Sequence, residues 1–402
     1  MRTTSVPLSL LPALAVLAAA CGQFVSLGGG SGSGGAGGGP DPGDPTSSST
    51  SDGTSVTTSA TTGNGAGGSG AGGEGGAPSS SGSGSGVGGN GGGVGGNGGG
   101  VNNAPCDDDL ALDDADPFHA AQAIELCTLA AGPDDPGLQD ARWVLPDGTP
   151  IPPGYDLPYA LGHGLFDGFG PNVLPRAGKR LLALSSGAAR RPGEPGYAAP
   201  MGGYTKNYHH APPEGFPKSS PACPGVLTGQ PYDGVALEVT LRAPIGTVGF
   251  SFDFNYYTAE FPSFICSSFN DAFVALLSPT PPGQTDGNIS FDGQGNVISV
   301  NNVFLDVCAC QGGPPCSVGG TVYPCSLGAG ELSGTGYDTG QGHGATGWLT
   351  TAAPMQGGKT FTVRFAVYDS GDAVLDSAAL VDHFRWISTG EPVVKTYRPV
   401  PP

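Results

Sequence analysis

Apolar and polar side chains alternate strictly over long stretches in the second half of this chain. Leu237, Val239 and Leu241 begin the pattern, and from Val248 to Tyr256 it resumes after a Pro-Ile-Gly turn. A period of two is typical of a β-strand with one buried face. Further strands are expected at 272–277, 288–291, 297–300, 348–351, 360–368 and 379–387. Because turn residues and almost no helical pattern separate them, the sequence predicts an all-β fold, an antiparallel β-sandwich or jelly roll over residues 231–390.

Residues 104–230 are expected to form a loop-rich N-terminal part of the same globular region, rich in Gly and Pro. Strands are predicted around 142–145 and 180–184. One short N-terminal helix is expected from Asp116, the N-cap, through Pro117 to Cys127, because proline favours the first helical position. Residues 391–402 are predicted to be a C-terminal tail.

The N-terminal fifth of the chain has the features of an exported lipoprotein. Residues 1–20 contain Arg2 followed by an apolar run too short to span a bilayer, which is typical of a signal peptide. Small residues precede Cys21, which is therefore expected to be acylated and to bind the membrane through its lipid. Residues 21–103 are rich in Gly, Ser and Thr and predict a disordered tether whose reach is on the order of 50 Å. We expect an outer-membrane or cell-surface lipoprotein.

The net charge and the number of cysteines limit the classes of protein to which this chain can belong. The formal net charge of −19 argues against nucleic-acid binding, which needs clustered basic residues. Of the nine cysteines, eight remain once Cys21 is acylated, and an even number fits an oxidising, exported setting. Proximity suggests four disulfides, although eight cysteines allow many pairings. Zinc is the alternative for Cys308, Cys310 and Cys316, but their spacing does not match that of usual zinc sites. The predicted pairs are Cys106 with Cys127, Cys223 with Cys266, Cys308 with Cys325, and Cys310 with Cys316.

Several segments together resemble the choice-of-anchor L domain, a family of bacterial extracellular domains named for the varied surface anchors that accompany them. The resemblance lies in Phe252–Phe264, Phe269–Phe273, Asn288–Asp292, Ile298–Asn302 and Tyr368–Ser377. It covers roughly residues 104–387 and is nearest to myxobacterial members that share the Gly162-His163-Gly164, Leu184–Gly187 and Pro221–Gly225 segments. The family implies anchorage at the cell surface and no established activity.

Acidic residues gather at the ends of the expected strands. Asp369, Asp372 and Asp376 fall in one loop, and Glu260 and Asp271 flank another. Oxygen ligands from two loops at one end of a sandwich suit calcium, so these five residues form the predicted metal site. Turn formation is the alternative, since Asp favours turns by binding its own backbone.

Three functions from different classes remain open at this point. The first is a binding or adhesion module for a surface glycan or protein, aided by exposed aromatic residues near Glu260. The second is a purely structural envelope protein with buried aromatics. The third is a carbohydrate-active hydrolase using Glu260 and Asp271 as its carboxylate pair; we expect no enzyme. The aromatic residues are Tyr256, Tyr257, Phe261, Phe264 and Phe269.

Overall fold

The structure, a computed structural model, describes residues 106–310, 313–318, 321–339 and 342–399. The predicted signal peptide, Cys21 and the tether lie outside these residues. The helices within the described part are all too short or too polar to cross a membrane.

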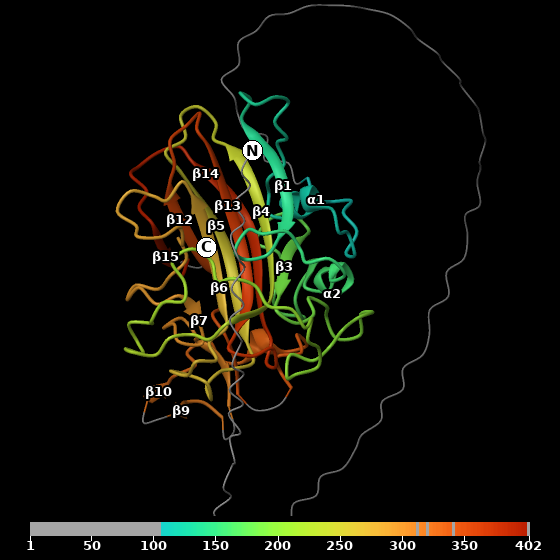
Figure 1. The fold of residues 1–402 in the computed structure, drawn as a ribbon, viewed down its shortest axis with the longest axis vertical. Coiled ribbons are helices and arrows are strands. Elements are labelled where there is room, and N and C mark those ends of the chain that lie inside the picture. The colour runs from blue at the N-terminus through green and yellow to red at the C-terminus, as the bar shows by residue number, and fades with distance from the viewer. Residues whose placement is uncertain (1–105, 311–312, 319–320, 340–341, 400–402) are drawn as a thin grey trace, which may run out of the picture. The chain divides into compact units, whose positions relative to one another are not determined.

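Two large antiparallel sheets and one small two-stranded sheet make up the described part of the fold (Figure 1). The five-stranded sheet has the order β1 (Gly137–Val144), β4 (Pro231–Arg242), β13 (Thr360–Ser370), β6 (Ala272–Ser278) and β7 (Ile298–Ser299). The main path of the eight-stranded sheet is β15 (Lys395–Tyr397), β12 (Leu349–Pro354), β5 (Gly249–Thr258), β14 (Ser377–Ile387), β3 (Leu181–Ser185) and β2 (His163–Phe166). Short strands β11 (His343–Ala345) and β8 (Val307–Ala309) extend it from β5, and β9 (Cys316–Val318) pairs with β10 (Thr321–Tyr323) separately.

The core lies between the two sheets and follows the period-two pattern. Phe250 of β5 stacks on Phe361 of β13 with ring centroids 5.3 Å apart, and Phe252 meets Phe365 edge to face at 4.9 Å. Phe254 reaches β6, where its ring lies 4.8 Å from that of Phe273. Aromatic pairs at these separations add to the stabilisation from burial alone. The all-β sandwich prediction is therefore confirmed.

The N-terminal helix is shorter than predicted. Helix α1 spans Pro117–Gln122, and the Asp116 side chain caps it by accepting a 2.8 Å hydrogen bond from the Phe118 N–H. It ends early because Glu125 adopts a left-handed backbone conformation. A second helix, α2 (Asp156–Ala160), and a 3₁₀ turn, η1 (Gly330–Leu332), were not expected from the sequence.

Two other boundaries differ from the predictions. The expected strand at 288–291 is reduced to single bridges at Asn288 and Phe291. The predicted C-terminal tail instead contributes β15, whose Thr396 pairs with Thr351 of β12. Arg398 then fixes the end of the chain by donating to the Thr346 carbonyl oxygen at 2.7 Å and to Asp306 at 2.8 Å. The sequence of β15 does not alternate between apolar and polar residues. The strand therefore forms because of its pairing with β12 and the contacts of Arg398.

Strand β5 is buried on both faces, whereas its alternation predicted one polar, solvated face. Asp253, on the polar side, accepts hydrogen bonds from Thr350 at 2.6 Å and Arg176 at 3.3 Å, and its Oδ2 lies 3.0 Å from His383 Nδ1. The loop that carries Arg176 covers this face. Polar residues can alternate with apolar ones in a fully buried strand when other segments supply their partners.

Candidate functional site

The core-facing stripes of three strands end in carboxyl groups at the same end of the sandwich. In β13 the stripe Phe361, Val363, Phe365 and Val367 continues to Asp369, after a register shift at the end of the strand. By the same period, Asp271 precedes Phe273 of β6 and Asp233 precedes Val235 in β4. All three carboxyl groups are almost fully buried. We call Asp233, Glu260, Asp271, Asp369 and Asp376, together with Lys206, the acidic end of the core.

Glu260, just after β5, and Asp271, just before β6, connect the adjacent ends of these two strands. The Asp271 N–H donates to Glu260 Oε2 at 2.9 Å. The Asp271 carboxylate in turn accepts from the Ser370 N–H at 3.1 Å and from the Ser377 hydroxyl at 2.9 Å. This carboxylate therefore links β6 to the ends of β13 and β14.

Lys206 supplies the buried ammonium group of the acidic end. Only 1% of the residue is exposed. Its Nζ donates to the carbonyl oxygens of Ser185 and Asp233, each at 2.9 Å, and to that of Ser186. The Lys206 N–H binds the Asp233 carboxylate at 2.6 Å. Lysine is rarely buried without such partners.

Several oxygen atoms of the acidic end have no hydrogen-bond partner among the described residues. Both carboxylate oxygens of Asp369 and of Asp376 are in this state, as are two atoms of residues adjacent in sequence to Asp271 and Asp369, Asn270 Oδ1 and Ser370 Oγ. Buried polar atoms are normally paired, so these oxygens are available to bind a water molecule, a proton or a cation. Beside Asp376 lies a cavity of about 20 Å³, which has room for about one water-sized species.

The pKa values of this cluster respond mainly to burial. Burial raises the pKa of Glu260 to about 8. It also raises the pKa of Asp271 well above the usual value, with a further rise from Glu260. For Asp369, burial and the charges of Asp271 and Asp376 act in the same direction. Burial outweighs the ammonium of Lys206 in raising the pKa of Asp376. Burial lowers the pKa of Lys206 to about 8.

The five carboxylates predicted to bind calcium are only partly brought together. Glu260, Asp271, Asp369 and Asp376 are buried at the acidic end, whereas Asp372 is exposed and its Oδ1 accepts from the Val374 N–H at 3.3 Å, as a turn former does. Within the described residues, only Cys308, Cys316 and Cys325 form a group of three potential ligands whose ligand atoms all lie within 4.8 Å of one another. No three of these carboxylates therefore have ligand atoms within 4.8 Å of one another.

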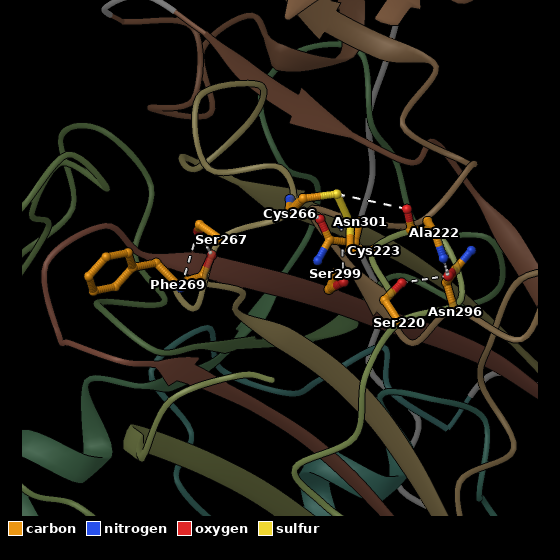
Figure 2. Close-up of a disulfide and its surroundings, with 9 residues drawn as sticks. All are labelled: Ser220, Ala222, Cys223, Cys266, Ser267, Phe269, Asn296, Ser299 and Asn301. Atoms are coloured by element: carbon orange, nitrogen blue, oxygen red, sulfur yellow. Dashed lines mark hydrogen bonds between the residues drawn. A yellow bond between two sulfur atoms is a disulfide. The ribbon is translucent and has the colours of Figure 1, made fainter. Parts of the chain in front are cut away.

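The loop between Glu260 and Asp271 is fixed by a disulfide between Cys223 and Cys266 (Figure 2). Two asparagines brace it. Asn301 Oδ1 accepts from the Cys266 N–H at 2.8 Å, and Asn296 Oδ1 accepts from the Ala222 N–H at 2.8 Å and from Ser220. The disulfide thus joins the long segment between β3 and β4 to the loop that carries Glu260 and Asp271.

Three of the four predicted cysteine pairs are bonded in the structure. These are Cys106–Cys127, Cys223–Cys266 and Cys310–Cys316. The fourth pairing, Cys308 with Cys325, is not formed, and both residues are buried free thiols. Cys325 Sγ lies 3.3 Å from Cys316 Sγ, and the sulfur atoms of Cys308, Cys316 and Cys325 all lie within 4.8 Å of one another.

The aromatic residues near Glu260 do not form an exposed patch. Tyr256, Tyr257 and Phe261 are fully buried. Phe264 and Phe269 are partly exposed and pack edge to face against each other, with ring centroids 5.8 Å apart. Stacking on a sugar ring would require accessible faces, which the first three residues lack.

Sequence reasoning missed Lys206 and Asp233. The signal for Asp233 was present, because it has the same parity as Val235, Leu237 and Val239 and so points into the core. No local pattern marks Lys206, since it lies in an irregular loop beside Asn207, whose φ is 61°.

Comparison with known families gives a match for part of the chain. Residues 237–383 match the model of the choice-of-anchor L domain, from within β4 to within β14, which confirms the resemblance predicted from the sequence. No curated protein matches the chain. A choice-of-anchor domain indicates a cell-surface-associated or extracellular module.

Proposed function

We propose that this protein, whose residues 237–383 are a choice-of-anchor L domain, is a lipid-anchored surface module for binding or adhesion whose acidic end takes a calcium ion. Cys21 would be the acylated residue and the Gly-rich segment the tether. The observation that supports the calcium ion is the set of unpartnered carboxylate oxygens on Asp369 and Asp376.

A charge argument favours a cation. The acidic end contains five buried carboxyl groups and one ammonium group, that of Lys206. An ionised carboxylate that is buried without compensation is costly, so the excess negative charge must be neutralised by protons or by a cation. Calcium takes six to eight oxygen ligands in flexible geometry, and extracellular modules bind it at about 10⁻⁴ to 10⁻³ M. Carboxylate, amide and hydroxyl oxygens are all present here, on Asp369, Asp376, Asn270 and Ser370.

Calcium is expected to stabilise the folded protein. For a chain that lacks residues 1–21 and keeps its disulfides, saturating calcium should raise the free energy of unfolding by about 2–3 kcal/mol over EDTA, the value for a ligand at about one hundred times its Kd. Asp369→Asn should remove most of this gain. The measurement is thermal unfolding across a calcium titration, with the exposed Asp140→Asn as the control for loss of one negative charge.

The pH dependence separates protons from calcium as the neutralising species. Since the folded-state pKa of Glu260 is raised to about 8, its protonated form contributes stability that is complete below about pH 4.5 and is lost as pH rises through 8. In EDTA the unfolding midpoint should therefore fall across that window. Calcium should reduce the fall, because it replaces the lost protons. A calcium-independent profile would leave protons alone as the neutralising species and remove the calcium proposal.

Anchorage and adhesion can be tested together on intact cells. Cys21→Ser should transfer the protein from the membrane fraction to the medium or the soluble fraction, because an acyl chain contributes about 0.8 kcal/mol per buried methylene to membrane binding. Cell–cell or cell–surface adhesion should fall with it. Ser26→Ala, five residues later, is the control and should leave both unchanged. Membrane retention of the Cys21→Ser protein would refute lipid anchoring at this residue.

The second candidate function is a purely structural envelope module. The burial of Tyr256, Tyr257 and Phe261 favours it, because these residues were expected to contact a ligand. Adhesion that persists after the protein leaves the membrane would support this alternative over the binding role.

Hydrolysis by Glu260 and Asp271 is not part of the proposal. These residues are 3% and 2% exposed, and the Asp271 N–H is bonded to the Glu260 carboxylate. A glycosidase needs its two carboxylates on opposite sides of an accessible sugar site.

A further inference from the structure

A compact cysteine cluster lies at strand β8, where the eight-stranded sheet extends from β5 through β11. It comprises Cys308 of β8, Cys316 of β9, Cys325 and the partly exposed Cys310. The first three are buried in a small apolar cluster that also contains Phe261 and Leu305. Cys316 is bonded to Cys310, yet its Sγ lies 3.3 Å from Cys325 Sγ.

The two free thiols of the cluster have different surroundings. The Cys308 thiol donates to the Leu305 carbonyl oxygen at 3.0 Å, and burial raises its pKa, so it stays protonated. A protonated thiol is a poor nucleophile. The sulfur of Cys325 lies 3.3 Å from Cys316 Sγ, a disulfide sulfur, and the Cys308 sulfur lies within 4.8 Å of both. Cys325 is therefore the residue placed to attack.

We propose that Cys325 exchanges with the Cys310–Cys316 disulfide and so releases Cys310 as a surface thiol. The Cys325 thiolate attacks Cys316 Sγ, a Cys316–Cys325 bond forms, the Cys310–Cys316 bond breaks, and Cys310 leaves as a thiolate that takes up a proton. The number of disulfides and of thiols is unchanged, so the step needs no oxidant. Such exchange is the normal reaction of a thiolate with a neighbouring disulfide.

The exchange moves reactivity from the interior to the surface. The buried cluster gains a disulfide between two buried residues, Cys316 and Cys325, while the partly exposed Cys310 becomes the reactive group. Its chemical partner would be a disulfide on another molecule. The Cys310 thiolate attacks that disulfide, forms a mixed disulfide and releases the partner's second sulfur as a thiolate. The cluster would thereby give the surface module a site for covalent attachment.

The test is to locate free thiols in the mature protein purified from the cell envelope without reductant. After incubation at pH 8, acid quenching and denaturation, N-ethylmaleimide is added and fragment-ion mass spectrometry locates the label. We expect full labelling of Cys308 and a label divided between Cys310 and Cys325. In Cys325→Ser, labelling of Cys310 should fall at least about tenfold, whereas Cys308→Ser, the matched control, should leave the division unchanged.

A second readout uses the folded protein and oxidised glutathione as the disulfide. Wild type should form a mixed disulfide at Cys310, and Cys325→Ser should not. The proposal is overturned if the wild-type label is confined to Cys308 and Cys325, if no cysteine is labelled because these two are bonded to each other, or if all four react and zinc is released. Because the wild-type protein itself supplies the first result, misfolding of a variant cannot obscure it.

Discussion

Replacing Lys206 with methionine should lower the free energy of unfolding by about 3–5 kcal/mol, the usual cost of removing one member of a buried charge network. Methionine keeps the length and apolar stem of lysine but leaves the carbonyl groups of Ser185, Ser186 and Asp233 without their shared donor. It also leaves the acidic end without its ammonium group. Urea unfolding of the chain without residues 1–21, followed by tryptophan fluorescence, measures the loss.

Lys218→Met is the matched control for this substitution. Its Nζ lies 2.6 Å from Asp286, and a third of its side chain is exposed, so its loss should cost about 1 kcal/mol or less. Adding Asp376→Asn to Lys206→Met should recover part of the stability, because one uncompensated carboxylate is removed with its partner. Equal effects of the two lysine substitutions would show that the acidic end is not a buried charge network.

Removing the Cys223–Cys266 disulfide by replacing both residues with serine should cost about 4 kcal/mol, the chain-entropy estimate for the 43-residue separation. The loop that carries Glu260 and Asp271 would lose its covalent link to the long segment between β3 and β4. The calcium concentration needed for half of the stabilisation should therefore rise. Unfolding in urea, with and without calcium, measures both effects.

The Cys310–Cys316 pair provides the comparison, because its separation is only 6 residues and the same estimate gives about 2 kcal/mol. Its residues pack near Phe261 of the same loop but carry none of the carboxyl groups of the acidic end, so its removal should leave the calcium requirement unchanged. A larger cost for the short pair would mean that the difference in loop length does not determine the stabilisation by these disulfides.

The strands show what local pattern can predict. Phe250, Phe252, Phe361 and Phe365 lie in the core as their parity predicts. The same parity placed Asp271 and Asp369 inside, yet their position near turns suggested a site in surface loops. Turn propensity and strand periodicity disagreed at these residues, and periodicity was the better guide.

The sequence predicted a disulfide correctly only where cysteines that are close in the sequence also pair in the structure. Three pairs follow that rule, whereas the fourth depends on which sulfur of a crowded cluster lies nearest to Cys325. The calcium prediction has the same limit, because ligand distances depend on how the ends of β6, β13 and β14 meet. The order of the strands in the two sheets decides which strand ends lie close together, and the local sequence does not encode that order.

The sequence by itself determined the all-β sandwich, most of its strands, the resemblance of residues 237–383 to the choice-of-anchor L domain, and the presence of acidic residues at the ends of several strands. Period and composition are local properties and can be read without the fold. Only the tertiary structure decided that β5 is buried on both faces, that residues 395–397 form a strand, and that Lys206 enters the acidic end. Each of these depends on partners far away in the chain. A buried charge or an edge strand is stable only when such partners satisfy its hydrogen bonds, and that condition exists only in the folded molecule.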